Sequence, residues 1–205
     1  MARTADEQRR VELLERIVDY VMANGLAELS LRPLAEAVES SPRVLLYYFE
    51  SKEALVDAVM LRARERQRAI FADLPRNPAS YRETVRAAWD VMSAPQHEGV
   101  FRLFFEVYGL ALQDPTRFPG FLDRAVGDWL DYLEPSARAN GYSPDDARAF
   151  ASMMLAGYRG FLLDLCATRD RARLSRAVDL WIDALDALPA PNGAGDGDHT
   201  CDEDC

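Results

Sequence analysis

Residues 40–55, SSPRVLLYYFESKEAL, place hydrogen-bonding side chains on both sides of an unbroken run of large apolar and aromatic residues. Neighbouring side chains on a helix point about 100° apart, so the five bulky residues 45–49 cannot all face one core. Part of this run must therefore point elsewhere. Arginine, lysine and tyrosine side chains, which flank or belong to the run, are groups that bind phosphate oxygens and base edges. The chemistry that this segment offers is recognition rather than bond making.

Residue patterns of helical-bundle enzymes are missing from the sequence. It has two histidines, no Glu-x-x-His pair on a helix and no phosphate-binding glycine loop. Cys166 stands alone in a helical pattern, while His199, Cys201 and Cys205 lie near the end of the chain at a spacing that matches no closed tetrahedral metal site. We therefore expect neither an enzyme nor a cofactor or metal.

Two short helices, over residues 31–38 and about 42–48, are predicted around the opening segment. Ser30 can cap the first, and Ser41 followed by Pro42 opens the second. The turn between them is only about three residues long. This arrangement is typical of a helix-turn-helix.

Longer helices flank this pair. The preceding helix is expected over about residues 5–24, with Thr4 and Glu7 as a capping box and Gly25 at its end. Ser51 caps the following helix, which is expected to reach about residue 72.

The rest of the chain also has helical patterns and no convincing strand alternation. Helices are expected over about residues 79–93, 97–113, 119–139 with a break at Pro135, 145–168 and 171–188. The prediction is an all-α chain of about nine helices, with a junction near residues 74–77. Residues 189–205 are small, acidic and without a basic side chain, so we expect a disordered tail.

Residues 10–60 resemble the DNA-binding domain of TetR-family transcriptional regulators. LSLRPLAEAV matches the second helix of that domain, SSPRVLLYYF the turn and recognition helix, and ESKEAL the start of the fourth helix. The resemblance implies a helix-turn-helix domain with its connecting helix over residues 5–73 and a ligand-binding and dimerisation domain over residues 78–188. It further implies a cytoplasmic homodimeric repressor that binds a palindromic DNA operator and is released by a small-molecule effector.

The resemblance also assigns the residues that contact DNA. Leu45 and Phe49 anchor the recognition helix to the core, and Arg43 is the strongest candidate for reading a base. Lys52, the single lysine among 24 basic residues, falls where the family contacts phosphate. The chain departs from the family at Glu39, where glycine is usual, and at Leu46, where tyrosine is frequent. The expected DNA contacts are Leu31, Arg32, Pro42, Arg43, Val44, Leu46, Tyr47, Tyr48 and Lys52.

Two readings of Glu39 and of the tyrosines stay open at this point. Near DNA, the carboxylate of Glu39 is unfavourable unless it accepts from a cytosine amine or pairs with an arginine. Of Tyr47 and Tyr48, one is expected to pack in the core and the other to present its hydroxyl to phosphate.

Apolar residues of the last two helices indicate association. Residues 174, 178, 181, 185 and 188 follow alternating spacings of four and three, the narrow seam of a coiled coil, although packing within one subunit would use the same pattern. Ala156, Gly157 and Gly160 allow close helix approach. The expected dimerisation residues are Met154, Phe161, Leu174, Val178, Trp181 and Leu185.

Aromatic residues are concentrated between these two ends of the chain, where they indicate either core or an effector cavity. The expected effector is small and apolar or aromatic, with Arg102, Glu106, Arg159 and Asp164 as candidates for polar contacts. The expected cavity residues are Trp89, Met92, Phe101, Phe104, Phe105, Tyr108, Trp129 and Tyr158.

Net charge is the main argument against DNA binding. The chain carries a formal charge of −10, but residues 1–70 hold 11 basic and 12 acidic side chains, so the excess acid lies mostly in the second part. A helical adaptor of the same fold without operator binding is therefore the alternative. No uncharged apolar run approaches the length of a membrane span, so no membrane partner is expected.

Overall fold

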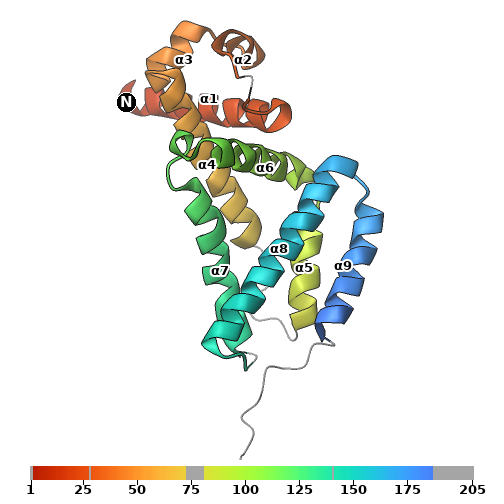
Figure 1. Ribbon diagram of the computed structural model, residues 1–205. Coiled ribbons are helices and arrows are strands. Elements are labelled where there is room, and N and C mark those ends of the chain that lie inside the picture. Colours follow the sequence, from red (N-terminus) through yellow and green to blue (C-terminus); the bar gives the residue numbers. More distant parts are fainter. Residues whose placement is uncertain (1, 28, 73–80, 140, 187–205) are drawn as a thin grey trace, which may run out of the picture.

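The computed structural model describes residues 2–27, 29–72, 81–139 and 141–186, and in these ranges the chain is all-α (Figure 1). The helices are α1 (Ala2–Asn24), α2 (Leu31–Ala37), α3 (Pro42–Phe49), α4 (Lys52–Ala72), α5 (Tyr81–Met92), α6 (Glu98–Gln113), α7 (Phe121–Ala139), α8 (Pro144–Thr168) and α9 (Arg171–Asp186), with short 3-10 helices η1 (Pro95–His97) and η2 (Pro115–Arg117). The prediction of an all-α chain of about nine helices is confirmed for the described residues. The expected junction at residues 74–77 and the tail at residues 189–205 lie outside them.

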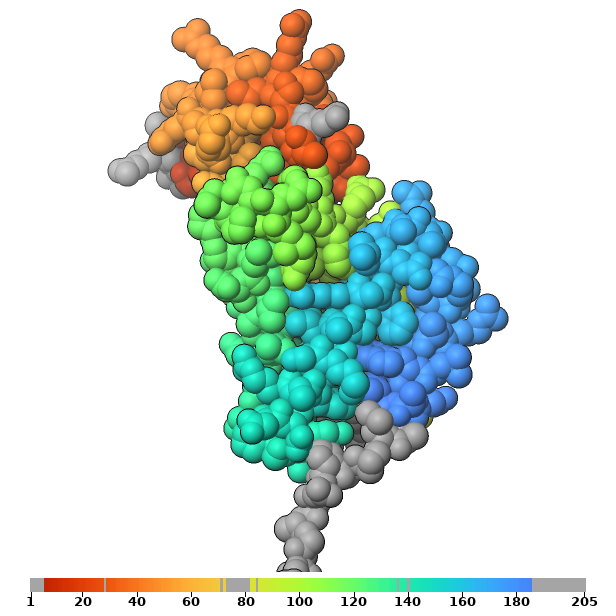
Figure 2. Space-filling view, viewed as in Figure 1, coloured from red at the N-terminus to blue at the C-terminus, as the bar shows by residue number. Residues whose placement is uncertain are grey.

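Helices α1–α3 form a separate head, and α4 leads from it into a body built from α5–α9 (Figures 1 and 2). Helix α6 passes beneath α1 and contacts it. A single buried cluster nevertheless runs from the head through Leu55, Val59 and Ala63 of α4 to Val85 and Trp89 of α5. Head and body therefore share one continuous core along α4.

The caps around α3 form as the sequence predicts. The Ser41 hydroxyl accepts from the Val44 N–H at 3.3 Å, and the Ser51 hydroxyl accepts from the Ala54 N–H at 3.0 Å. Ser30 occupies the N-cap position of α2, but its side chain makes no capping hydrogen bond.

Two local predictions are wrong. Helix α1 begins at Ala2, so Thr4 lies inside the helix and cannot be its N-cap. Helix α7 continues through Pro135 to Ala139 without a break. A proline inside a helix costs one backbone hydrogen bond, but α7 packs closely along α8, and Ala137 beyond the proline is buried. Packing therefore overrides the local preference at this point.

Candidate DNA-binding surface, effector cavity and subunit interface

Helix α3 is anchored by its apolar side. Leu45 is fully buried and Phe49 is nearly so, in the same cluster as Leu34, Val38 and Leu55. This confirms the predicted division of the run 45–49 into buried and exposed residues. A recognition helix needs this rigid attachment because its other side must meet DNA in one fixed orientation.

The other side of α3 is exposed. Tyr47 has 69% of its surface exposed, and Val44 and Leu46 have 39% and 40%. Pro42 and Arg43 at the start of α3, Arg32 of α2 and Lys52 of α4 are also exposed, while Leu31 is half-buried. These residues lie at the end of the molecule formed by α2 and α3, away from the body (Figure 1). Their contacts with DNA stay a prediction.

Tyr48 differs from its neighbour. It is half-buried, its hydroxyl donates to the Asp6 carboxylate at 2.9 Å, and its carbonyl accepts from Arg10 Nε at 3.3 Å. The carboxylate of Asp6 raises the pKa of Tyr48 above its ordinary value by holding the phenolic proton. Tyr48 thus fixes α3 to α1 in this structure, and Tyr47 is the tyrosine with the more exposed side chain.

Glu39 occupies the position that ends α2. Its φ is +51°, in the left-handed region that favours glycine, and the N–H groups of Glu39 and Ser40 donate to the carbonyls of Glu36 and Ala35. This is a Schellman arrangement, which explains why glycine is suited to the position. The Glu39 carboxylate accepts from Arg16 Nη2 at 3.2 Å. Of the two alternatives for the Glu39 carboxylate, a cytosine amine or an arginine as its partner, the structure therefore shows the arginine.

Charged pairs hold α4 against α1. Glu15 of α1 accepts from both Arg62 and Arg66 of α4, and Arg66 also donates to Asp19. Partial burial acts to raise the pKa of Glu15, but hydrogen bonds and charge from Arg66 and Arg62 outweigh it, so the pKa is lowered from its ordinary value. Helix α1 of the head is thus fixed to the middle of α4.

A second attachment joins α1 to α6. Arg102 Nη2 donates to the carbonyls of Met22 (2.5 Å) and Ala23 (2.8 Å), which belong to the unpaired C-terminal end of α1. One turn further along α6, Glu106 Oε1 accepts from the backbone N–H groups of Leu26 (2.8 Å) and Ala27 (2.6 Å). We call Arg102 and Glu106, with these four backbone groups, the α1–α6 clamp.

Gly25 makes the clamp sterically feasible. Its φ is +87°, and a Cβ at this position would lie 3.0 Å from Glu106 Oε2. Glycine therefore provides both the backbone conformation and the room for the carboxylate.

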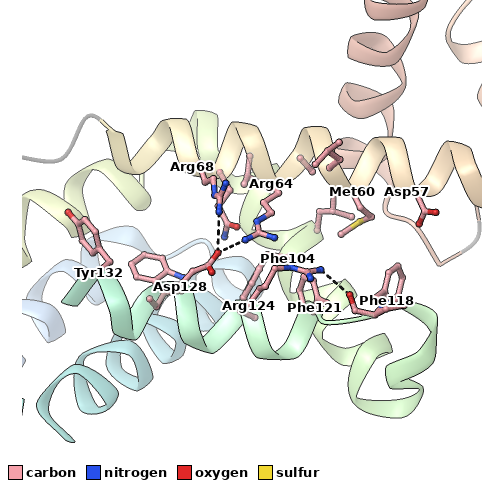
Figure 3. A pocket seen from close by; sticks show the side chains of 18 of the residues that line it. Asp57, Met60, Arg64, Arg68, Phe104, Phe118, Phe121, Arg124, Asp128 and Tyr132 are labelled. Carbon is pink, nitrogen blue, oxygen red and sulfur yellow. Dashed lines mark hydrogen bonds and ion pairs between the residues drawn. The ribbon is translucent and has the colours of Figure 1, made fainter. Parts of the chain in front are cut away.

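A cavity of about 600 Å³ lies between α4, α6, the segment that follows η2 and α7 (Figure 3). Its volume is in the range of small-molecule sites. Its apolar and aromatic lining residues are Met60, Leu61, Ala63, Val100, Leu103, Phe104, Phe118, Pro119, Phe121, Ala125, Trp129 and Tyr132. Its polar lining residues are Asp57, Arg64, Gln67, Arg68, Arg124, Asp128 and Asp131.

Charged side chains bridge the two long walls of this cavity. Asp128 of α7 pairs with Arg64 of α4 at 2.5 Å and with Arg68 at 3.6 Å (Figure 3). Arg124, one turn before Asp128, instead donates to the carbonyl of Pro119 at 3.0 Å. The sequence analysis did not identify these four charged residues. Their i, i+4 spacing on each helix was the available signal.

Two of the predicted cavity residues, Phe104 and Trp129, line the large cavity. The other six lie elsewhere. Trp89 is fully buried and donates from Nε1 to the Ser175 hydroxyl, and Tyr158 is buried and donates to the Val85 carbonyl at 2.8 Å. Both aromatic residues therefore have core positions with satisfied polar groups.

The four remaining predicted residues are Met92, Phe101, Phe105 and Tyr108. Met92 and Phe101 are buried and line a separate small cavity of about 90 Å³. Phe105 and Tyr108 are half-buried on α6, where both pack beside Phe104.

None of the polar candidates lines the large cavity. Arg102 and Glu106 form the α1–α6 clamp, and Asp164 pairs with Arg173 at 2.7 Å. Arg159 lies behind the wall, where it donates to the Ala125 carbonyl and stacks over Phe104, with 5.8 Å between its Cζ and the ring centroid. Its buried Nε has no hydrogen-bond partner among the described residues, and desolvation lowers the pKa of Arg159 from its ordinary value.

The predicted dimerisation residues are mostly buried within one chain. Met154, Leu174, Val178 and Leu185 are buried, and Phe161 and Trp181 are half-buried. Trp181 lies directly on Gly157, where an added Cβ would be 2.4 Å from its ring. The structure therefore shows that this seam packs within one subunit.

A different stripe of α8 and α9 remains uncovered. On α8 it consists of Met153, Ala156, Gly160 and Leu163, and on α9 of Leu180 and Ala184, all of them exposed. The two helices lie on the same face of the molecule (Figure 2). We call these six residues the α8–α9 stripe.

Helix α8 is also long and apolar enough, by length and composition, to cross a membrane, although only 28% of the relevant window is buried in the chain. A single such helix is weak evidence for a membrane span. Its window contains Arg159 and Asp164, and its inner side packs into the core through Met154, Leu155 and Leu162. Cover by another protein surface is the simpler explanation for its exposed apolar residues.

In the described part of the chain, no three His, Cys, Asp or Glu side chains lie close enough together to hold a metal ion. His199, Cys201 and Cys205 lie outside it.

Comparison with known proteins identifies the head. Residues 13–59 match the family of bacterial regulatory proteins described as the tetR family. No curated protein sequence matches the chain. This family match agrees with the expectation of a regulatory protein rather than an enzyme.

Solved structures share the fold of the described chain, head and body together. A TetR-family transcriptional regulator from Cytophaga hutchinsonii superposes with a TM-score of 0.73 at 20% identity, covering 90% of this chain and 96% of its own. A transcriptional regulator from Rhodococcus sp. Rha1 gives 0.72 at 15% identity, covering 88% and 99%. The multidrug binding protein EbrR, solved with imidazole, gives 0.55 at 22% identity, covering 90% and 93%. Residues 13–59 therefore match the tetR family of bacterial regulatory proteins, and the described chain has the fold of TetR-family transcriptional regulators.

Proposed function

We propose that the protein is a ligand-responsive transcriptional repressor that binds a palindromic operator as a homodimer. The observation that carries this proposal is the exposed face of α3, anchored by Leu45 and Phe49 in a domain that matches the tetR family. Arg43 would read a base in the major groove, and Lys52 would bind phosphate.

The α8–α9 stripe is the proposed dimer interface. Two copies related by a twofold axis would bury the same six residues on both sides. Ala156 and Gly160 would let the backbones approach closely, while Leu163 and Leu180, which are 53% and 70% exposed, would supply apolar area. The buried seam of α9 then supports this interface from inside.

The 600 Å³ cavity is the proposed effector site. Its walls belong to α4, which leads directly to α3, and to α6, which holds the end of α1 through the clamp. An effector that binds better when α4 and α6 are displaced would shift the equilibrium away from the spacing that fits the operator. A structure of the same fold, the multidrug binding protein EbrR, was solved with imidazole, which supports ligand binding by this architecture.

The test is binding of the full chain to the DNA that flanks its own gene, by footprinting and titration across a salt series. We expect protection of two half-sites and an affinity that falls steeply with salt, because phosphate contacts release counterions. Random DNA of equal length is the control. Equal affinity for both DNAs at every salt concentration would refute the repressor and favour an adaptor of the same fold.

A further inference from the structure

The large cavity is lined by three arginines and three aspartates, and these charges are unevenly paired. Arg64 and Arg68 on α4 and Arg124 and Asp128 on α7 are each spaced by four residues, so each pair lies on one side of its helix. The two helices thus bring three guanidinium groups and one carboxylate to the cavity wall. We call these four charged residues, three arginines and one aspartate, the quartet.

Within the quartet, the carboxylate is shared and one cation is left over. Asp128 pairs with both Arg64 and Arg68, whereas Arg124 has only the Pro119 carbonyl as a partner among the described residues (Figure 3). A carbonyl leaves the charge of a guanidinium uncompensated. Arg124 is therefore available to a carboxylate that enters the cavity.

A fourth arginine, Arg159, adds positive charge behind the wall of the cavity. Arg159 is partly buried, stacks on the cavity residue Phe104 and bonds to the carbonyl of the cavity residue Ala125. It has no carboxylate partner in the described chain, and its Nε is buried without a hydrogen bond. An unpaired cation in a poorly solvated place is unfavourable unless an anion lies nearby.

The carboxylates of the cavity wall do not cancel this arrangement. Asp57 and Asp131 also line the cavity and, like Arg124, are exposed, but in the described chain neither forms an ion pair with Arg64, Arg68 or Arg124. Beside Arg124, the wall is formed by Phe104, Phe118 and Phe121 (Figure 3). The site therefore offers arginines for a head group and aromatic rings for an apolar body.

We propose that the effector is an amphipathic carboxylate, with an aromatic or alkyl body, and that Asp128 holds the place of its head group when the cavity is empty. This inference rests on the proposed effector role of the cavity. The entering carboxylate binds Arg124 and takes Arg64 from Asp128. Because Arg64 belongs to α4 and Asp128 to α7, this exchange removes a cross-link between the helix that leads to the DNA-binding head and the body.

The test is calorimetric titration of the full chain with three probes of one shape: 1-naphthoate, neutral 1-naphthamide and cationic 1-naphthylmethylammonium. We expect naphthoate to bind at least about tenfold more tightly than either other probe, because arginine–carboxylate bonds are charge-assisted. Equal or weaker binding of naphthoate relative to naphthamide, or no binding of naphthoate, would overturn the inference.

Variants separate a head-group site from general attraction. Arg124→Gln should weaken naphthoate at least about fivefold and leave naphthamide unchanged. Asp128→Asn should strengthen naphthoate at least about threefold, because the competing carboxylate is gone. The matched control is Arg138→Gln on the same helix, whose guanidinium pairs with Glu134, and it should change neither probe. Weaker binding of naphthoate by Asp128→Asn would contradict the proposed exchange.

Failure of this inference is distinguishable from failure of the proposed function. If the chain binds its operator but prefers naphthamide, the proposed effector class is wrong and the proposed repressor function stands. If the chain prefers naphthoate but binds no operator, the carboxylate site stands and the repressor function is wrong.

Discussion

Replacing Gly157 of α8 is predicted to destabilise the protein, even when the new residue is alanine. A Cβ built at this position lies 2.4, 2.8 and 2.9 Å from three carbon atoms of the Trp181 ring, whereas carbon atoms in favourable contact are about 3.5–4.0 Å apart. The ring has little freedom to retreat, since it packs edge-to-face against Tyr158 and Phe161 with centroids 5.5 and 5.4 Å away. Gly157→Ala must therefore displace α9 or distort the aromatic cluster.

The expected size follows from two opposing effects. Overpacking costs about 1–3 kcal/mol, and alanine in a helix is about 0.5–1 kcal/mol more favourable than glycine. Because the added Cβ would lie 2.4 Å from the ring, we take an overpacking cost of about 2–3 kcal/mol and a helical gain of about 1 kcal/mol, so the net loss of unfolding free energy for Gly157→Ala should be about 1–2 kcal/mol. For a chain of this size, this corresponds to a fall in Tm of about 2–8 °C.

The assay is thermal and urea unfolding followed by circular dichroism at one fixed protein concentration, because association would otherwise change Tm. Gly109→Ala is the matched control: it lies on the exposed side of α6 with no atom within 4 Å of an added Cβ, so stability should rise by about 0.5–1 kcal/mol. In a Trp181→Leu background, the penalty at Gly157 should nearly vanish. Wild-type or higher stability of Gly157→Ala would refute the reasoning.

Four further predictions follow from the head and its attachments. Arg43→Ala should relax operator specificity at one base position by about 1–3 kcal/mol. Lys52→Ala should instead weaken binding to all sequences alike and lower the slope of log affinity against log salt concentration by about one. Titrations against operator variants check both, and identical profiles for the two variants would contradict the assigned roles. Glu39→Gly should be more stable to urea than Glu39→Gln by up to about 1 kcal/mol, because only the glycine relieves the left-handed backbone while both remove the charge; a less stable glycine variant would contradict this. Glu106→Gln should lower the unfolding free energy by about 1–2 kcal/mol and accelerate hydrogen exchange of the Leu26 and Ala27 amides, which donate to Glu106. Unchanged exchange of these amides would be the contrary result. Because the folded pKa of Glu15 is lowered, its contribution to stability is present at neutral pH and is lost as pH falls through that pKa below about 4.5, so wild type should lose more stability between pH 5 and 3 than Glu15→Gln; parallel losses would argue against the pairing with arginines of α4.

Features of the head were predictable because their causes are local. The caps at Ser41 and Ser51 and the end of α1 at Gly25 depend on a few adjacent residues, and the alternation of buried and exposed positions on α3 follows from helical geometry. Glu39 was recognised as unusual, but its pairing with Arg16 required the packing of α2 against α1.

Features of the body depended on tertiary contacts that a single sequence does not encode locally. The spacing of Leu174, Val178 and Leu185 predicts a buried seam but not whether the covering surface belongs to the same chain. The aromatic concentration was visible, yet only Phe104 and Trp129 of the predicted rings line the large cavity. Arg64 and Asp128 resembled solvated surface charges, and only the meeting of α4 with α7 places them on one cavity.

The α1–α6 clamp makes the connection between body and head abrupt. Arg102 binds carbonyl groups at the end of α1, and Glu106 binds N–H groups just beyond it. The carbonyl and N–H groups of one short backbone stretch therefore both depend on adjacent turns of α6. N–H···O hydrogen bonds have donor–acceptor distances of about 2.7–3.2 Å. A movement of α6 away from the end of α1 by about 1 Å would therefore lengthen all four contacts beyond this range together, so they should be lost as a unit.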